Sequence, residues 1–178
     1  MIYCFLANGF EEVEAITPVD LLRRAGADVK TVGVGSKTIT GSHLVEITCD
    51  MTADEIRLCD ELEAIILPGG MPGTINLEAS AAVQSAIDYA FEQKKLICAI
   101  CAAPSILGHK GLLEGKKATC YPGFEKELTG AYASCERAVT DGNFITGKGA
   151  GAALEFGLSI VAKLFGAKKA DDLRASLQ

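Results

Sequence analysis

Tryptophan is absent from this chain, histidine occurs only twice, and aromatic residues make up 6% of the 178 positions. The shortage of histidine leaves few imidazole groups for acid–base catalysis or for binding a transition metal. Lysine and arginine number 17 against 23 aspartates and glutamates, which gives a net charge of −6, and the lysines are scattered. Because nucleic acids and anionic membranes are bound by basic patches, we expect neither as a partner.

The chain also has no long hydrophobic run, no repeat and no low-complexity tract. The N-terminus passes directly into the apolar segment Ile2–Ala7, which is too short to span a bilayer or to serve as a signal peptide. What the chain does have is 49% hydrophobic residues, enough for a full core at this length. We therefore expect one domain over residues 1–178 and a cytoplasmic location.

Cysteine, in contrast, is abundant. Seven cysteines in a chain without an export signal indicate free thiols in a reducing compartment, because an odd number cannot form a complete disulfide framework. Cys98 and Cys101 form a C-x-x-C pair, but there is no second such pair and there are only two histidines, so we expect no metal site. A redox-active dithiol is also disfavoured, because Cys98 lies inside an apolar run.

Apolar runs bounded by turn residues alternate along the chain with segments of helical periodicity. Strands are predicted at residues 2–7, 28–34, 44–48, 64–67, 96–100 and 117–121, with an antiparallel hairpin of residues 133–139 and 143–147. Helices are predicted at residues 11–26, with a kink or a restart at Pro18, and at 52–58, 79–94, 103–110, 150–165 and 167–177. Because the central runs are apolar throughout, this order predicts an α/β fold with a doubly wound, mostly parallel sheet sandwiched by helices.

The apolar run that starts at Leu96 ends in a sharp bend at Cys101. Ala99 and Ala103 flank this cysteine with the small-x-nucleophile-x-small spacing that lets a nucleophile elbow turn from strand into helix. Pro104 fits only the first turn of a helix, so Cys101 should lie next to a helix N-terminus, which should lower its pKa below the usual ~8.5. This pattern predicts a reactive thiolate, and the alternative is that Cys101 is one more buried core cysteine.

Two further segments follow predicted strands, at the edge where open α/β sheets carry their sites. The loop Pro68–Gly73 contains three glycines, whose backbone N–H groups can approach a ligand closely, although it could equally be a plain connection. Glu11, Glu12 and Glu14 begin the helix after the first strand. Acidic residues at that position also simply complement the helix dipole.

With the elbow, the Pro68-Gly69-Gly70 loop, the segment from Glu11 to Asp20 and the glycines of 147–151 in this order, the sequence resembles the ThiJ/PfpI family. This family belongs to the class I glutamine amidotransferase-like superfamily, and the nearest branch is that of the parkinsonism-associated deglycase and its bacterial homologues. The resemblance implies a flavodoxin-like sandwich in which Cys101 is the reactive cysteine and Glu14 the acid beside it. It also implies that Gly69, Gly70 and Ala102 lie at an oxyanion or substrate site, and that no cofactor is needed.

The resemblance carries two further expectations. Tyr121-Pro122 stands where the branch often has a histidine before a proline, so an imidazole base is lost and Tyr121 would line the substrate site instead. His43 matches a segment that approaches the partner subunit's site in a homodimer, and we therefore expect a homodimer. The alternative for His43 is a solvated loop residue.

These residues support a cofactor-independent glyoxalase or deglycase, in which the Cys101 thiolate attacks methylglyoxal, glyoxal or their adducts with amines and thiols. The partner would then be a small dicarbonyl or a glycated protein. An alternative is an oxidative-stress sensor and chaperone that acts through oxidation of Cys101. A PfpI-like peptidase or amidase is less favoured, because Ala102 stands where that branch has a histidine after the cysteine.

Overall fold

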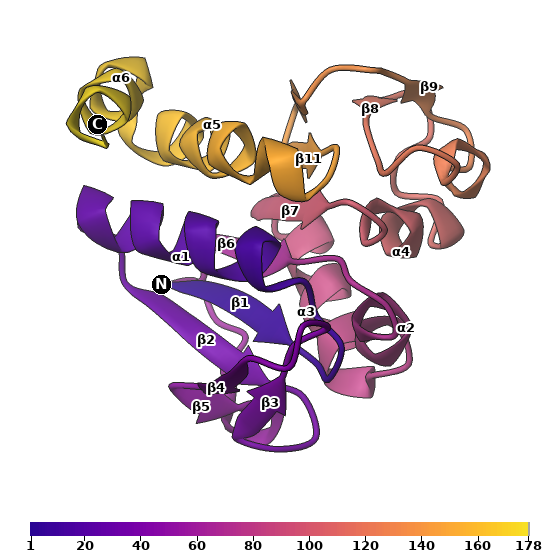
Figure 1. The fold of residues 1–178 in the computed structure, drawn as a ribbon. Helices are drawn as coiled ribbons and strands as arrows, with labels where there is room; N and C mark the ends of the chain where they lie inside the picture. The colour runs from indigo at the N-terminus through magenta and orange to yellow at the C-terminus, as the bar shows by residue number, and fades with distance from the viewer. Residues whose placement is uncertain (178) are drawn as a thin grey trace.

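The computed structural model describes residues 1–177, and its centre is a seven-stranded sheet in the order β10-β11-β7-β6-β1-β2-β5 (Figure 1). The strands are β1 (Ile2–Leu6), β2 (Val29–Gly33), β5 (Met51–Thr52), β6 (Ala64–Leu67), β7 (Leu96–Ile100), β10 (Ala138–Asp141) and β11 (Phe144–Gly147). Neighbouring strands are parallel except for the antiparallel pair β10–β11. The predicted doubly wound, mostly parallel α/β sheet is therefore confirmed.

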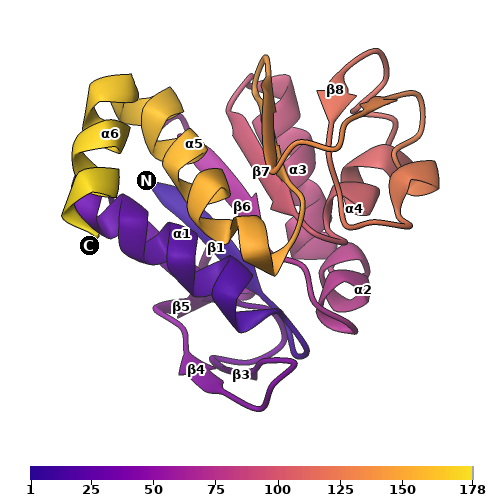
Figure 2. The same ribbon diagram turned by 45° about the horizontal axis from the view of Figure 1, so that its top comes forward.

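Helices cover both faces of this sheet (Figures 1 and 2). One face carries α1 (Glu12–Ala25), α5 (Ala153–Phe165) and α6 (Ala167–Ser176), and the other carries α2 (Gly73–Glu78), α3 (Ala81–Glu92) and α4 (Pro104–His109). None of the helices within residues 1–177 combines the length and apolar character that crossing a membrane requires.

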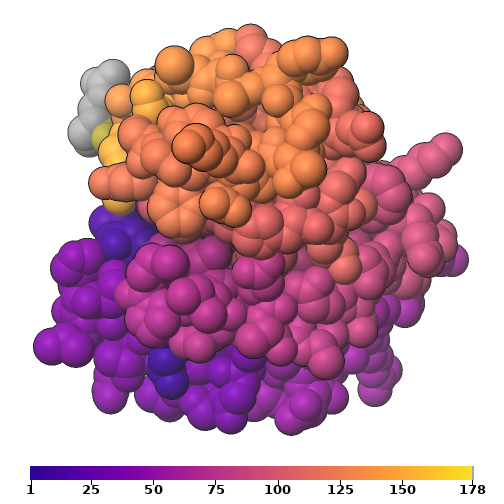
Figure 3. Space-filling model, turned by 90° about the vertical axis from the view of Figure 1, so that its right-hand side faces the viewer, coloured from indigo at the N-terminus to yellow at the C-terminus, as the bar shows by residue number. Residues whose placement is uncertain are grey.

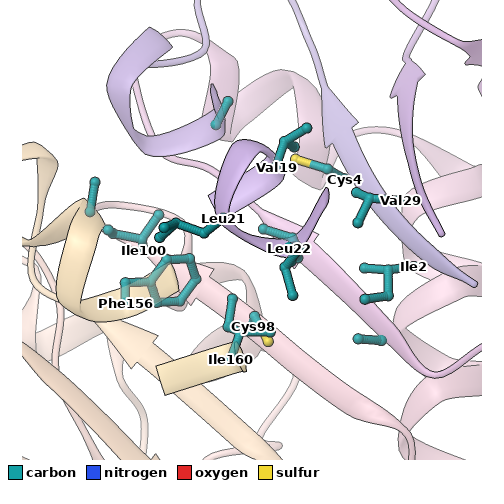
Figure 4. Packing of buried hydrophobic residues seen from close by; sticks show 14 of the residues in the cluster. Ile2, Cys4, Val19, Leu21, Leu22, Val29, Cys98, Ile100, Phe156 and Ile160 are labelled. Carbon is teal, nitrogen blue, oxygen red and sulfur yellow. The ribbon is translucent and has the colours of Figure 1, made fainter. Parts of the chain in front are cut away.

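The core has two layers because alternate residues of each strand point to opposite faces. In β1, Cys4 and Leu6 face the layer under α1 and α5, whereas Tyr3 and Phe5 face the layer under α3. Figure 4 shows the first of these layers, where side chains of α1 and α5 meet those of β1 and β7. Strands buried on both faces must be apolar throughout, which is why their positions could be predicted from the sequence.

The helix α1 runs through Pro18 as one continuous element, so it does not restart there. Pro18 removes one backbone donor from the helix, but α1 packs closely against α5 at this point. A Cβ on Gly157 of α5 would lie 2.6 Å from Leu21 Cδ1 and 3.1 Å from Pro18 Cα. Tertiary packing of this kind stabilises most helices in proteins and outweighs the lost hydrogen bond.

Several short elements differ from the prediction. The strand expected to begin at Leu44 begins at Glu46, because Leu44 has a φ of 66° in a turn, and this strand, β4 (Glu46–Thr48), pairs with β3 (Thr38–Thr40) outside the central sheet. The helix predicted at 52–58 is only a 3₁₀ turn, Ala53–Glu55, although its capping box between Thr52 and Glu55 is present. The helix predicted at 79–94 begins later, since Ser80 caps α3.

The connection between α4 and β10 lies to one side of the central sheet. There β8 (Lys117–Ala118) pairs with β9 (Tyr132–Ala133) in a separate two-stranded sheet, so the predicted strand stops before Tyr121. A 3₁₀ turn, Glu125–Glu127, lies between them. His109, the last residue of α4, contacts Glu78 of α2 and Glu127 of this turn, and Figure 3 shows the salmon and orange part of the chain directly above the magenta part that contains α2.

Candidate active site

The backbone bends sharply at Cys101, immediately after β7. Its φ is 65°, in the left-handed region that residues with a side chain rarely adopt. Two hydrogen bonds hold the bend: the Cys101 N–H donates to the Gly147 carbonyl oxygen (2.9 Å), and the Tyr121 N–H donates to the Cys101 carbonyl oxygen (2.8 Å). Strained backbone supported in this way is typical of functional sites, and the predicted elbow is present.

Glu14 brings a buried carboxyl group to this bend from the first turn of α1. Its side chain is 1% exposed. One carboxyl oxygen, Oε2, accepts a hydrogen bond from the Gly69 N–H (3.0 Å), and the Cys101 thiol and the Ala150 N–H lie close enough to the carboxyl group to influence its pKa. The structure therefore brings together the two residues that the sequence analysis expected to be paired.

The glycine loop after β6 completes this cluster. A Cβ on Gly69 would lie 2.6 Å from Glu14 Oε2 and 2.7 Å from Cys101 Cβ, so no larger residue fits there. Gly70 has a φ of 89°, and its N–H and that of Ala102 lie near the Cys101 sulfur, where they act to lower the pKa of the thiol. The expected backbone donors thus converge on the sulfur atom itself.

Burial raises the pKa of Glu14 to about 7, although the Cys101 thiol and the Gly69 N–H oppose this shift. The expectation that the pKa of Cys101 is lowered is wrong in direction. Burial and the adjacent Glu14 carboxylate raise the pKa of the Cys101 thiol to about 12, although the N–H groups of Ala102 and Gly70 oppose this shift. At neutral pH the thiol is therefore protonated and the Glu14 carboxyl group is close to its midpoint, so that the ionised form of Glu14 is suited to accept the thiol proton.

The DJ-1/PfpI family pattern matches residues 1–163. The chain belongs to this family. The Parkinson disease protein 7 homolog of Danio rerio is 37% identical over 176 residues, which cover 97% of this chain and 93% of that protein. Deglycase PH1704 of Pyrococcus horikoshii is 34% identical over 145 residues, which cover 80% of this chain and 86% of that protein. Some relatives are longer: the chain spans 45% of Protein DJ-1 homolog A of Arabidopsis thaliana, at 35% identity and with 97% of this chain covered.

Solved structures of the same superfamily have the same fold. A DJ-1 superfamily protein from Salmonella typhimurium matches with a TM-score of 0.93 and 34% identity, over 99% of this chain and 96% of that one. Toxoplasma gondii DJ-1, solved in an oxidized form, matches with a TM-score of 0.94 and 31% identity over the same shares of the two chains.

In this member of the family, Tyr121 and the turn before α5 form a cavity beside the pair. The cavity has a volume of about 280 Å³. Gly149 separates it from Glu14, because a Cβ there would lie 3.3 Å from the Tyr121 ring and 4.0 Å from Glu14 Oε1. Sequence analysis noted the glycines of 147–151 only as part of the family pattern. The roles of the Gly147 carbonyl and the Ala150 N–H depend on backbone positions, which leave no sign in the side chains.

Neither histidine is hydrogen-bonded to Cys101 within residues 1–177. His43 folds back on its own chain, with Nδ1 3.0 Å from Glu12 Oε2 and 3.5 Å from Glu11 Oε2. These three side chains place ligand-type atoms within 4.8 Å of one another, and they are the group that could hold a metal ion, away from the elbow. His109 lies between Glu78 (2.6 Å) and Glu127 (2.9 Å), so both of its ring nitrogens are occupied.

All seven cysteines are free thiols, as expected. Cys98 is fully buried in β7, and burial raises its pKa well above the ordinary value for a thiol. It therefore does not form a reactive dithiol with Cys101.

Proposed function

We propose that this protein is a cofactor-independent glyoxalase or deglycase that acts on methylglyoxal, glyoxal or their adducts with amines and thiols. The observation that carries this proposal is the close approach of the Cys101 side chain and the buried carboxyl group of Glu14 at the elbow, where Glu14 Oε2 and Cys101 Cβ would lie 2.6 Å and 2.7 Å from a Cβ on Gly69. Relatives named as deglycases support the same class of activity. A location in the cytoplasm, where these metabolic aldehydes arise, belongs to the same proposal.

The first step is attack of sulfur on the aldehyde carbon. The thiol proton moves to Glu14 as the S–C bond forms, and the electron pair of the carbonyl bond moves to oxygen. As the sulfur becomes bonded to carbon, the N–H groups of Gly70 and Ala102 become available to the oxyanion. Each such donor contributes about 3–4 kcal/mol in comparable sites.

The second step completes the chemistry without an oxidant. Glu14 first returns the thiol proton to the oxyanion, which becomes a hydroxyl group. The Glu14 carboxylate then carries a proton from the former aldehyde carbon to the neighbouring carbonyl carbon, while the hydroxyl proton passes to the neighbouring carbonyl oxygen, and the adduct becomes a thioester. Water then hydrolyses the thioester and releases the thiol. Methylglyoxal and one water together contain the atoms of lactate, so the balance requires no redox cofactor.

In an amine or thiol adduct the former aldehyde carbon carries a hydroxyl group. Glu14 passes the hydroxyl proton to the amine or thiol, which leaves as the carbonyl bond forms again in the site, and the same two steps then follow.

A second candidate is the sensor role, in which peroxide oxidises Cys101 to a sulfinate. The buried Glu14 and two N–H donors around the sulfur favour it, because they would hold sulfinate oxygens. A peptidase is not favoured, since both histidines are engaged by glutamates and no imidazole base is hydrogen-bonded to Cys101.

Lactate formation from methylglyoxal by the purified protein tests the proposal. Cys101→Ser and Glu14→Gln should each lose at least ~10²-fold in kcat, because one lacks the nucleophile and the other cannot carry a proton. The control is Cys135→Ser, which removes an exposed thiol and should turn over normally. Full activity of Cys101→Ser would show that Cys101 is not the nucleophile and would refute the proposed mechanism.

The same Glu14→Gln preparation separates the two candidates. If the protein is only a sensor, wild type forms no lactate, and Cys101 of the variant still gains two oxygens under mild peroxide. Mass spectrometry of Cys101 measures this gain.

A further inference from the structure

Among the residues that line the cavity near the catalytic pair are an arginine and a lysine, and none of the described lining residues is an aspartate or a glutamate, in a molecule of net charge −6. Its lining consists of Tyr121, Pro122, Arg137 and the turn Lys148–Ala152. Two of these residues connect the cavity to the catalytic pair: the Tyr121 N–H donates to the backbone carbonyl of Cys101, and a Cβ on Gly149 would lie 4.0 Å from Glu14 Oε1. A group bound in the cavity would therefore lie on the Glu14 side of the site.

We propose that this cavity is a subsite for an anionic group of the substrate and that Lys148 recognises this group. This inference rests on the proposed function. The substrate class is then a 2-oxoaldehyde adduct of an amine or thiol that carries a carboxylate close to the adduct. A neutral dicarbonyl alone would use the catalytic pair without using this subsite.

Lys148 is the cation available for this role. It is half-buried, and its ammonium group donates to the Cys135 carbonyl oxygen at 3.3 Å. Within residues 1–177, no carboxylate oxygen lies within 4 Å of its nitrogen. An ammonium group has three N–H donors, so Lys148 keeps donors for an anion.

Arg137 has a different function in the lining. It pairs with Glu155, at 3.1 Å from Nε to Oε1, and it donates to the Gly151 carbonyl oxygen. These bonds fix the turn that forms the cavity wall, and they neutralise the guanidinium. Arg137 is therefore a positioning residue, whereas Lys148 supplies the uncompensated charge.

Two further features favour an anion. Residues 150–152 lead directly into α5, and the N-terminal end of this 13-residue helix adds partial positive charge. The volume of about 280 Å³ also exceeds what the dicarbonyl unit needs, since one water occupies ~30 Å³ in the liquid. The space can hold the part of an adduct that lies beyond the reacting carbons.

The first test does not depend on turnover. Lactate, which carries a carboxylate, should protect Cys101 from alkylation by iodoacetamide, and neutral lactamide should protect it less. In Lys148→Ala the protection constant for lactate should weaken about tenfold, the usual effect of losing one charge-assisted hydrogen bond, and Lys148→Arg should restore part of it. The matched control, Lys168→Ala, removes a lysine that pairs with Asp172 on α6 and should behave as wild type.

The second test measures substrate preference. Methylglyoxal adducts of N-acetylcysteine and of its neutral amide differ only in the carboxylate. Wild type should prefer the carboxylate adduct in kcat/KM, and Lys148→Ala should reduce this preference about tenfold, mainly through KM. Equal protection by lactate and lactamide in wild type, or an unchanged preference in Lys148→Ala, would overturn the subsite. Lactate protection that depends on Lys148, without turnover of either adduct, would instead uphold the subsite and reject the enzyme.

Discussion

Glu14 links the chemistry of the site to the stability of the protein. Burial raises the pKa of its carboxyl group from 4.5 to about 7 in the folded state. A raised pKa contributes stability that is fully present below the unfolded pKa and is lost as the pH rises through the folded pKa. The free energy of unfolding should therefore fall by on the order of 3 kcal/mol between about pH 4.5 and pH 7 through this residue alone.

Glu14→Gln should remove most of this dependence. Urea unfolding at pH 5 and pH 8 should show wild type losing stability at the higher pH and Glu14→Gln losing much less. The control is Glu92→Gln, an exposed residue of α3, which should follow wild type. If wild type and Glu14→Gln lose the same free energy of unfolding between pH 5 and pH 8, burial does not raise the pKa of Glu14 in the folded protein.

The residues of the pair could be predicted from the sequence, but their protonation could not. The small neighbours of Cys101 and the position of Pro104 indicate the elbow, because they are local requirements of a strand-to-helix turn. The direction in which the thiol pKa shifts depends on burial and on the charge of Glu14, which precedes Cys101 by 87 positions in the chain. A helix N-terminus considered alone therefore predicts the wrong sign.

Gly108 shows how closely the elements around the site are packed. It lies in α4, and a Cβ there would be 1.9 Å from the Glu127 carbonyl oxygen and 2.8 Å from Leu128 Cα. Gly108→Ala should destabilise the protein by about 2–3 kcal/mol through overpacking, despite the better helix propensity of alanine. Thermal unfolding measures the effect.

The matched control is Gly151→Ala, at which a Cβ would meet no atom within 4 Å. Its melting temperature should stay close to that of wild type. If the two variants melt at the same temperature, α4 and the Glu125–Glu127 turn are packed less closely than the structure indicates.

Helices and strands could be predicted from the sequence where burial determines their residues. They were missed where contacts with distant parts of the chain determine them. The strands β1, β6 and β7 are apolar throughout because both faces are covered. The helix α2, in contrast, begins with Gly73 and was not predicted. Its start is held by bonds to the β1–α1 loop, from the Gly73 N–H to the Gly9 carbonyl (3.2 Å) and from Asn76 to the Asn8 carbonyl (2.8 Å).

On the scale of the whole molecule, one apolar surface lies next to the start of α1. Val13 and Ile16 of α1 are 49% and 38% exposed, and Leu44 and Val45 of the neighbouring loop are 83% and 50% exposed. Glu12 joins the two parts, because its carboxylate accepts the N–H groups of His43 and Val45. Contiguous exposed apolar side chains of this kind are typical of interaction sites.

We propose that a second copy of the chain covers this surface, in agreement with the homodimer expected from the sequence. Light scattering at micromolar concentration should give twice the monomer mass for wild type, and Leu44→Asp should shift it toward the monomer, because a carboxylate would be buried without a partner. Tyr132→Ser, which removes another exposed apolar side chain from β9, should leave the dimer intact. A monomeric wild type would contradict the proposal, and His43 would then have no route to the site of another subunit.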